Sequence, residues 1–479
     1  MIFTRAASSN MQPFSVASVP LPFFGLAIWR AWMNVTFVAP NADIPFFSHA
    51  SHELFDMVML GVFLAGIALA KRWSPLTTKR WALVACPALM TPLSVTACAS
   101  LFIPEASMLA TPLTIPAAIG ATFMVLLWSE RYAGLPPYKV LVGLTGSYAL
   151  AAVIVFLLNG FHPPYLAGFT ALLPAASIAC LVRSKSEGYH VEGLLHTGRG
   201  TIPWRLIAVM VLYSFSIGFS GIQASATGGT GSALTAFIVA GTYFAALAFM
   251  AERISFASMQ KLPPLLMALG FLATPLSPFL GQWISGPLIA ASYLLYYFFV
   301  DTSLCDVSKR FGISAIWLFS IEEAASMGSE LAGRTLAPLL AIKPLGAGGE
   351  VSPLSIALLA IAAIAAAILL LDGRSLKTHW GIRFMEVGAL STDSERVVRV
   401  GEWVRTAAID HGLTPRETEV LALLAEGTSM RGIAQELVVS EGTAKSHASH
   451  IYEKLGMRGK RDLEARVAEA VGAGEKRRG

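Results

Sequence analysis

Residues 440–461 hold the side chains best suited to recognising a nucleic acid. In residues 443–461 five lysines and arginines stand against a single acid, Glu453, for a local charge of +4. Helical spacing puts Ala444, Ala448, Ile451 and Leu455 on one apolar stripe and leaves a polar face of Thr443, Lys445, Ser446 and Ser449, with Lys454 to one side. A short basic helix after a tight turn fits the major groove of DNA. The pattern predicts double-stranded DNA as a partner.

A second set of charges lies inside long apolar stretches: Arg30, Glu322, Glu323, Glu330 and Arg334. Charges are costly in a bilayer, so each marks a candidate functional position. A cavity holding Arg30 and some of the carboxylates would bind a polar or charged small molecule of unknown identity. Two alternatives stay open: a static network in which Glu330 and Arg334 neutralise each other one turn apart, and a proton-coupled role.

Other polar groups offer less chemistry. We expect Asp301 and Asp306 to be solvated at the cytoplasmic end of a span. His49, His52 and Glu53 could bind zinc, but no further ligand pair accompanies them, so ordinary loop polarity is the favoured interpretation. The four cysteines have neither metal-ligand nor disulfide spacing, and the sequence contains no nucleophile elbow or phosphate-cradling loop. We expect no catalytic residue, no metal, no cofactor and no enzyme activity.

The elements that must position these residues are mostly apolar helices. Of 479 residues 55% are hydrophobic and 14% charged, against about 25% charged in soluble proteins. Apolar stretches long enough to cross a bilayer recur along the chain. They predict a polytopic bundle of twelve spans, at residues 18–39, 54–70, 81–103, 108–128, 138–158, 163–182, 204–223, 231–250, 262–281, 284–301, 312–341 and 352–371.

The connections between these spans alternate in charge. Lysines and arginines gather after the even-numbered spans, for example Lys71, Arg72, Lys79 and Arg80 after the second, and Lys343 is an exception. The positive-inside rule therefore predicts that both termini are cytoplasmic, in a cytoplasmic (inner) cell membrane. The net charge of +5 follows from such loops and needs no nucleic acid to explain it.

The longest connection between consecutive spans, at about 183–203, separates the first six spans from the last six. This organisation resembles the major facilitator superfamily, whose halves are related by an axis along the membrane normal. The resemblance is architectural. The superfamily's basic signature between spans two and three contains an Asp, which the segment 70–76 lacks, and this departure puts alternating access in doubt.

After Leu371 the chain becomes normally charged and soluble in character. Apolar residues at helical spacing predict a juxtamembrane helix near 395–408, which pairs with a partner, packs on the next unit or is a plain spacer. Thr414 and Glu417 form a capping box with Pro415 at the first helical position. Ser429 and Ser440 are caps of the next two helices. Residues 460–471 form a fourth.

The stretch from Leu413 to about Val467 resembles the LuxR/FixJ type of helix-turn-helix domain. The resemblance is carried by Leu413-Thr414-Pro415-Arg416-Glu417, Val420-Leu421, Gly427, Ile433-Ala434, Leu437, Ser440, Thr443, Lys445, His447, Ile451 and Lys454-Leu455. It departs at Ala444, where the family usually has Val. The resemblance implies base contacts from Lys445, Ser446 and Ser449, and phosphate contacts from Thr443 and His450. It also implies homodimer contacts through the fourth helix, with Ala465, Val467 and Ala468 as apolar candidates.

The predicted organisation is an all-α chain in five parts: a cytoplasmic segment (1–17), a membrane domain (18–371, halves 18–182 and 204–371), a linker (372–412), the helix-turn-helix domain (413–471) and a basic tail (472–479). Together these parts resemble membrane-embedded LuxR-type transcription regulators. The resemblance implies a one-component regulator that senses a ligand or a membrane state. A transporter with a regulatory DNA-binding tail, and a passive membrane tether, are the alternatives.

Overall fold

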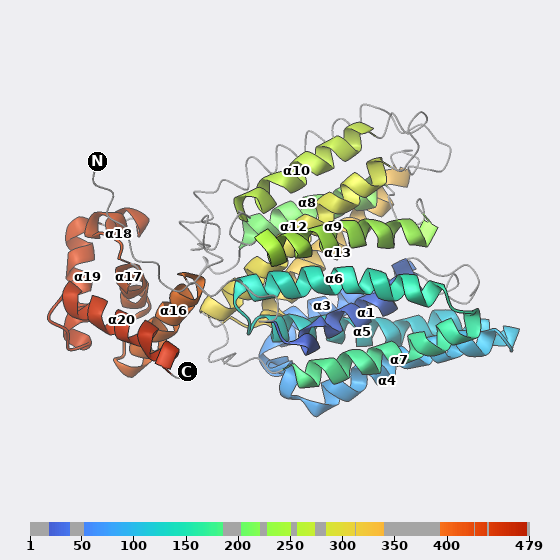
Figure 1. The fold of residues 1–479 in the computed structure, drawn as a ribbon, viewed down its shortest axis with the longest axis horizontal. Helices are drawn as coiled ribbons and strands as arrows, with labels where there is room; N and C mark the ends of the chain where they lie inside the picture. The colour runs from blue at the N-terminus through green and yellow to red at the C-terminus, as the bar shows by residue number, and fades with distance from the viewer. Residues whose placement is uncertain are drawn as a thin grey trace. The chain divides into compact units, whose positions relative to one another are not determined.

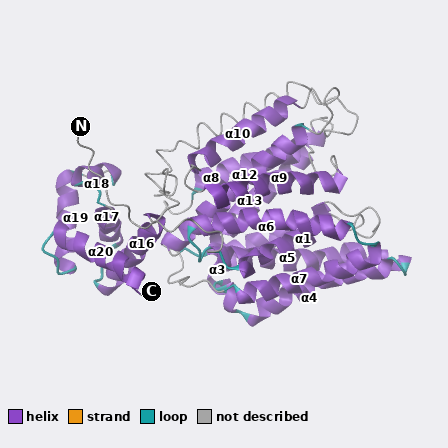
Figure 2. Ribbon diagram, in the orientation of Figure 1, coloured by secondary structure: helices purple, strands orange, loops and turns teal. Residues whose placement is uncertain are grey.

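The computed structural model describes residues 19–38, 52–184, 203–220, 228–250, 256–273, 284–311, 313–339, 393–425, 427–437 and 440–476. Throughout these residues the regular structure is helical (Figure 2). The chain divides into two compact units, Phe14–Val387 and a second that contains Gly388–Gly479. The predicted segment 1–17, the predicted span 352–371, most of the linker and the end of the basic tail lie outside the described residues.

The larger unit, here called the membrane unit, is a bundle of long helices. It contains α1 (Leu26–Met33) between the short helical turns Leu21–Gly25 and Asn34–Val38, then α3 (His52–Trp73), α4 (Arg80–Ser100), α5 (Ala110–Tyr132), α6 (Pro137–Asn159), α7 (Pro163–Arg183), α8 (Trp204–Ser220), α9 (Gly228–Met250), α10 (Phe256–Ala273), α12 (Ser285–Phe311) and α13 (Ala315–Leu339). A described helix overlaps each predicted span from 18–39 to 312–341.

Among the described residues, six helices are long and apolar enough to cross a membrane: His52–Trp73, Arg80–Ser100, Pro104–Tyr132, Pro137–Asn159, Pro163–Arg183 and Ser285–Lys309. Their outward faces carry exposed large apolar side chains, such as Val84 and Phe156, which lipid would cover. The apolar parts of α8, α9 and α10 are shorter, and α13 carries four charges. The six helices indicate a multi-pass membrane protein.

The helices of the membrane unit run alongside one another in two groups. In Figure 1 the helices α1 to α7, coloured from blue to blue-green, gather below, and the helices α8 to α13, coloured from green to orange-yellow, gather above. Within the first group α1 packs on α6, and α4 on α5 and α7; within the second α8 packs on α13, and α10 on α12. Between the groups α3 packs on α13, and α6 on α9 and α12.

The smaller unit, here called the C-terminal unit, has five helices among the described residues: α16 (Asp393–Asp410), α17 (Pro415–Ala425), α18 (Met430–Glu436), α19 (Glu441–Lys454) and α20 (Lys460–Lys476). Val420, Leu421, Ile433, Ile451 and Leu463 lie at the centre of one shared apolar core. The predicted linker helix is present as α16. Its Val400, Val404 and Ala407 are buried in that core, so the helix packs on the unit that follows it, which is one of the three alternatives.

The predicted helix starts are confirmed in atomic detail. The backbone N–H of Thr414 donates to Oε2 of Glu417 at 2.7 Å, and the N–H of Glu417 donates to the Thr414 hydroxyl at 3.2 Å, which is a reciprocal capping box. Ser429 accepts from Gly432 N–H at 3.2 Å and Ser440 from Thr443 N–H at 3.0 Å. After α19 the chain turns at Gly456, whose φ of +63° suits a residue without Cβ.

Candidate functional site

The helix predicted to recognise DNA is α19, here called the recognition helix. Its Ala444, Ala448, Ile451 and the adjoining Leu455 are buried, as the apolar stripe predicts. Its opposite face is exposed to solvent and holds Thr443, Lys445, Ser446, Ser449 and His450. The core thus fixes the helix by one face and presents the other, which is the arrangement that groove insertion requires.

The contacts of the exposed face within the protein are weak enough to exchange for DNA. Lys445 Nζ lies 3.0 Å from Oε1 of Glu441, with both side chains at least half exposed, and such surface pairs contribute little. The hydroxyls of Thr443 and Ser440 are 2.8 Å apart at the helix start. The DNA contacts expected of the exposed residues, whether to bases or to phosphates, stay predictions.

Lys454 is placed differently from the other predicted DNA contacts. Its Nζ lies 2.7 Å from Oε2 of Glu417 and also donates to the carbonyl of Gly412 at 3.4 Å. Glu417 is buried, and hydrogen bonds from Lys454 and from the N–H of Thr414 lower its pKa to about 2. Lys454 therefore ties the recognition helix to the capping box, a structural role that the sequence argument did not assign to it.

Arg416 has a contact that the sequence argument missed. Its Nη2 donates to the carbonyl of Leu437, at the end of α18, at 2.6 Å, and its Nη1 donates to Glu419 at 2.7 Å. The first bond satisfies a carbonyl at a helix end and holds α18 against α17. Arg416 thus helps to hold the end of α18, the helix that precedes the recognition helix.

One candidate for the dimer contact is corrected. Val467 is buried in the core of the C-terminal unit beside Leu463, so it is taken up by the fold and not available to a second copy. Ala465 and Ala468 lie on the exposed side of α20. A dimer through this helix stays a prediction that now rests on those two positions.

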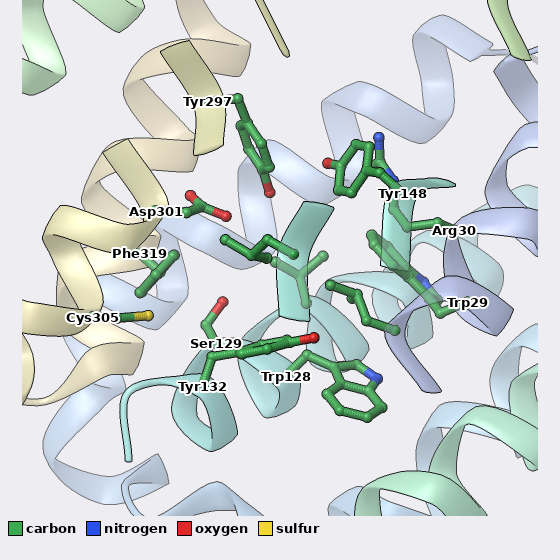
Figure 3. Close-up of a pocket in the computed structure, with 13 residues that line it drawn as sticks. Trp29, Arg30, Trp128, Ser129, Tyr132, Tyr148, Tyr297, Asp301, Cys305 and Phe319 are labelled. Atoms are coloured by element: carbon green, nitrogen blue, oxygen red, sulfur yellow. The ribbon is translucent and has the colours of Figure 1, made fainter. Parts of the chain in front are cut away.

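In the membrane unit a small cavity lies among α1, α5, α6, α12 and α13 (Figure 3). Its free volume is about 20 Å³, about the space of one water molecule. The lining residues are mostly aromatic and aliphatic: Leu26, Trp29, Arg30, Val125, Trp128, Ser129, Tyr132, Leu144, Tyr148, Tyr297, Asp301, Cys305 and Phe319.

Arg30 and Asp301 are the charged residues of this lining. The Arg30 guanidinium lies over the Tyr148 ring, 4.3 Å from its centre. Asp301, on α12 across the cavity in Figure 3, is only 5% exposed. The expectation that Asp301 and Asp306 are solvated is wrong: the other helices enclose this end of α12, and both carboxylates are buried.

The acids predicted to join Arg30 lie outside the cavity lining. Glu322 is buried on α13 and accepts from Ser326 at 2.9 Å. Glu323 lies near enough to interact electrostatically with Arg30. The structure thus brings one predicted pocket residue, Arg30, to the cavity and adds Asp301, which hydropathy had assigned to the helix end.

Glu330 and Arg334 form the ion pair predicted from their spacing, and it extends to a second helix. Arg334 Nη2 contacts Glu330, while Nη1 lies 2.8 Å from Oδ2 of Asp56 on α3. His52 Nδ1 is 3.0 Å from the same Asp56 oxygen. His49 lies outside the described residues, and within the described part of the chain no group of three or more potential ligands suits a metal ion.

Glu130 is a buried acid that the sequence argument overlooked. Its carboxylate accepts from the N–H groups of Leu76 and Thr77, at 3.1 and 2.7 Å. It therefore closes the turn between α3 and α4 from the end of α5. Because the partners are backbone groups more than fifty positions away, no local motif announces the contact.

Comparisons with known proteins agree with the geometry of the C-terminal unit. The family described as bacterial regulatory proteins, luxR family, matches residues 411–467. "Probable transcriptional regulatory protein NarL" of Mycobacterium tuberculosis is 45% identical over 67 residues, 14% of this chain and 30% of that protein. "Transcriptional regulatory protein LnrK" of Bacillus subtilis is 50% identical over 46 residues, 10% of this chain and 21% of LnrK.

"Oxygen regulatory protein NreC" of Staphylococcus aureus is 43% identical over 51 residues, 11% of this chain and 24% of NreC. The chain thus covers less than a third of the length of each of these relatives. The similarity lies in the helix-turn-helix segment. Residues 411–467 are a LuxR-type helix-turn-helix DNA-binding domain, carried on the same chain as the apolar helices of the membrane unit.

Proposed function

We propose that the protein is a membrane-bound one-component transcription regulator and not an enzyme. The observation that carries this proposal is an exposed recognition helix on a LuxR-type domain in a chain with apolar helices of spanning length. The DNA-binding domain would bind promoter DNA as a homodimer through α20. The membrane unit would respond to a ligand or to the state of the bilayer.

We further propose twelve spans in two six-helix halves, in a major-facilitator-like arrangement. The packing of the described helices supports it. If the predicted spans are numbered from one to twelve along the chain, the proposed two-fold axis places each span of the first half onto the span six positions later. This operation exchanges the contacting pair α3–α13 with the contacting pair α6–α9. It also exchanges α1–α6 with α8–α13, and α4–α5 with α10–α12. All of these pairs are in contact.

In this proposal both termini lie on the cytoplasmic side of the inner membrane, where the DNA-binding domain reaches the chromosome. A ligand acts only through different affinities for two states of the membrane unit. The output is a change in dimer geometry or in the exposure of the recognition helix. Promoter activation and repression are both compatible with this scheme.

Genome-wide capture of DNA crosslinked to the full-length protein tests the proposal. We expect discrete promoter sites with the wild-type protein in the membrane fraction, and loss of their enrichment with Lys445→Ala. Lys71→Ala, which changes an exposed lysine on α3 outside the DNA-binding domain, serves as the matched control and should retain the sites. Absence of any discrete site, or equal enrichment with Lys445→Ala, would contradict the proposal.

One observation favours a second candidate, a transporter with a regulatory DNA-binding tail. The cavity is lined by α1, α5 and α6 from one group of helices and by α12 and α13 from the other, which is where secondary transporters bind substrate. Uptake or efflux by cells that express the chain without its DNA-binding domain would support a transporter over a pure sensor.

A further inference from the structure

Polar atoms without protein partners gather at the cavity in the membrane unit. The Nε atom of Arg30, the Nε1 atom of Trp29 and the Oδ1 atom of Asp301 are buried and have no hydrogen-bond partner among the described residues. Buried polar groups in proteins are almost always paired. Since all three residues line the same cavity, their unmet hydrogen bonds point to a bound polar molecule.

The charges around the cavity decide what kind of molecule balances them. Arg30 is the cation of this region, and Glu323 lies near enough to interact with it electrostatically. Asp301 shares the same guanidinium, and the buried Glu322 is a third carboxyl group nearby. Three carboxyl groups thus share one guanidinium, and a buried carboxylate without a full counter-charge is costly, so a second positive charge beside Asp301 is the favoured complement.

The walls are suited to an organic cation in particular. The rings of Tyr148 and Tyr297 have centres 5.9 Å apart. The other aromatic residues of the lining, all labelled in Figure 3, are Trp29, Trp128, Tyr132 and Phe319. Aromatic faces attract ammonium groups, and a cage of several rings with one carboxylate discriminates an ammonium from a neutral group of equal shape. Arg30 already occupies one face of Tyr148 in this manner.

We propose that this cavity binds a small organic cation, with its ammonium group at Asp301 and its body among the rings of Tyr297, Tyr148 and Trp29. This inference rests on the proposed sensing role and names the ligand class of that site. The free space of about 20 Å³ holds a water molecule and no larger ligand. Binding therefore requires the lining helices or rings to separate, so the cation favours a state different from this one, as a sensor needs.

Equilibrium binding of radiolabelled choline to the full-length protein in lipid nanodiscs, without DNA, tests the inference. Choline carries a quaternary ammonium, and 3,3-dimethylbutan-1-ol has the same shape without the charge. We expect saturable choline binding that the alcohol does not displace. Asp301→Asn should weaken binding at least about tenfold, and Asp301→Glu should retain it.

Asp306→Asn is the matched control, because Asp306 is a buried carboxylate on the same helix outside the cavity lining. It should bind choline like the wild type. No saturable binding, equal displacement by the alcohol, or equal binding by Asp301→Asn would overturn the inference. If Asp301→Asn fails to fold, the comparison of choline with the alcohol on the wild-type protein still decides. Because the assay contains no DNA, its failure leaves the DNA-binding proposal standing.

Discussion

The Nζ atom of Lys454 lies 2.7 Å from Oε2 of Glu417, and this ion pair joins the last turn of the recognition helix to the cap of α17. Glu417 uses the same oxygen to accept from the N–H of Thr414. One buried carboxylate oxygen therefore serves both the capping box and the link between helices. Removal of Lys454 leaves that carboxylate in a buried position with a weaker set of partners.

The ion pair predicts a local loss of stability in Lys454→Met. Breaking a partly buried pair leaves an uncompensated charge, and the partial exposure of Lys454 reduces the effect to about 1–2 kcal/mol. Hydrogen exchange of the α17 amides in the full-length protein would measure it as reduced protection. Lys445→Met, which removes an exposed pair with Glu441, should change protection by less than about 0.5 kcal/mol. Equal effects of the two substitutions would refute the structural role of Lys454.

Acid should weaken the same contact. The pKa of Glu417 lies at about 2, below its ordinary value of 4.5. Because the folded-state pKa is the lower one, the stabilisation is fully present above about pH 4.5 and is lost as the pH falls through 2. The protection of α17 should therefore decline between these pH values. In Glu417→Gln this loss of protection with acid should be absent. If protection declines as in the wild type, other titrating groups cause the loss.

Binding of DNA should depend on salt through the cations of the recognition helix. Each phosphate contact made by a lysine contributes about one unit to the slope of log affinity against log salt concentration. If Lys445 contacts a phosphate, Lys445→Ala reduces this slope by about one; if it contacts a base, the substitution relaxes sequence preference and the slope changes less. Titration of a captured promoter fragment at several salt concentrations distinguishes the two. A variant that matches the wild type in both slope and sequence preference would remove Lys445 from the interface.

The contact of Arg334 with Asp56 joins α13 to α3. Both side chains are only 14% exposed, so a double-mutant cycle of Asp56→Asn and Arg334→Gln should give a coupling of about 1–2 kcal/mol. Thermal unfolding of the protein in nanodiscs would measure it. Lys71→Gln, at an exposed lysine on α3, is a control for nonspecific charge effects. Additive effects of the two substitutions would mean that this pair contributes no cohesion between the helices.

The features predicted correctly from sequence are those that neighbouring residues determine. Ser440 caps α19 because its side chain accepts from an N–H three residues away, and Ala444 is buried because helical spacing places it with Ala448 and Ile451. The same logic predicted the pairing of Glu330 with Arg334. Such local relationships need no knowledge of the rest of the fold.

The features that sequence could not supply depend on which distant segments meet. Asp301 falls at the end of an apolar stretch, and hydropathy alone assigns such a residue to water. Its burial follows from the packing of α12 against α5, α6 and α13. Val467 was misassigned because an amphipathic helix has one apolar face, and sequence alone does not say whether that face meets its own core or a second copy.

Val400, Val404 and Ala407 of α16 are buried within the core of the C-terminal unit. This burial determines which fragment should be expressed when the DNA-binding domain is studied alone. A piece cut at residue 411, where the family match begins, would lack these three side chains and open the hydrophobic centre to water. A fragment that starts at Asp393 retains α16, so its hydrophobic core stays covered. Because α16 contributes to this core, a displacement or rotation at the start of α16 acts directly on the core of the C-terminal unit.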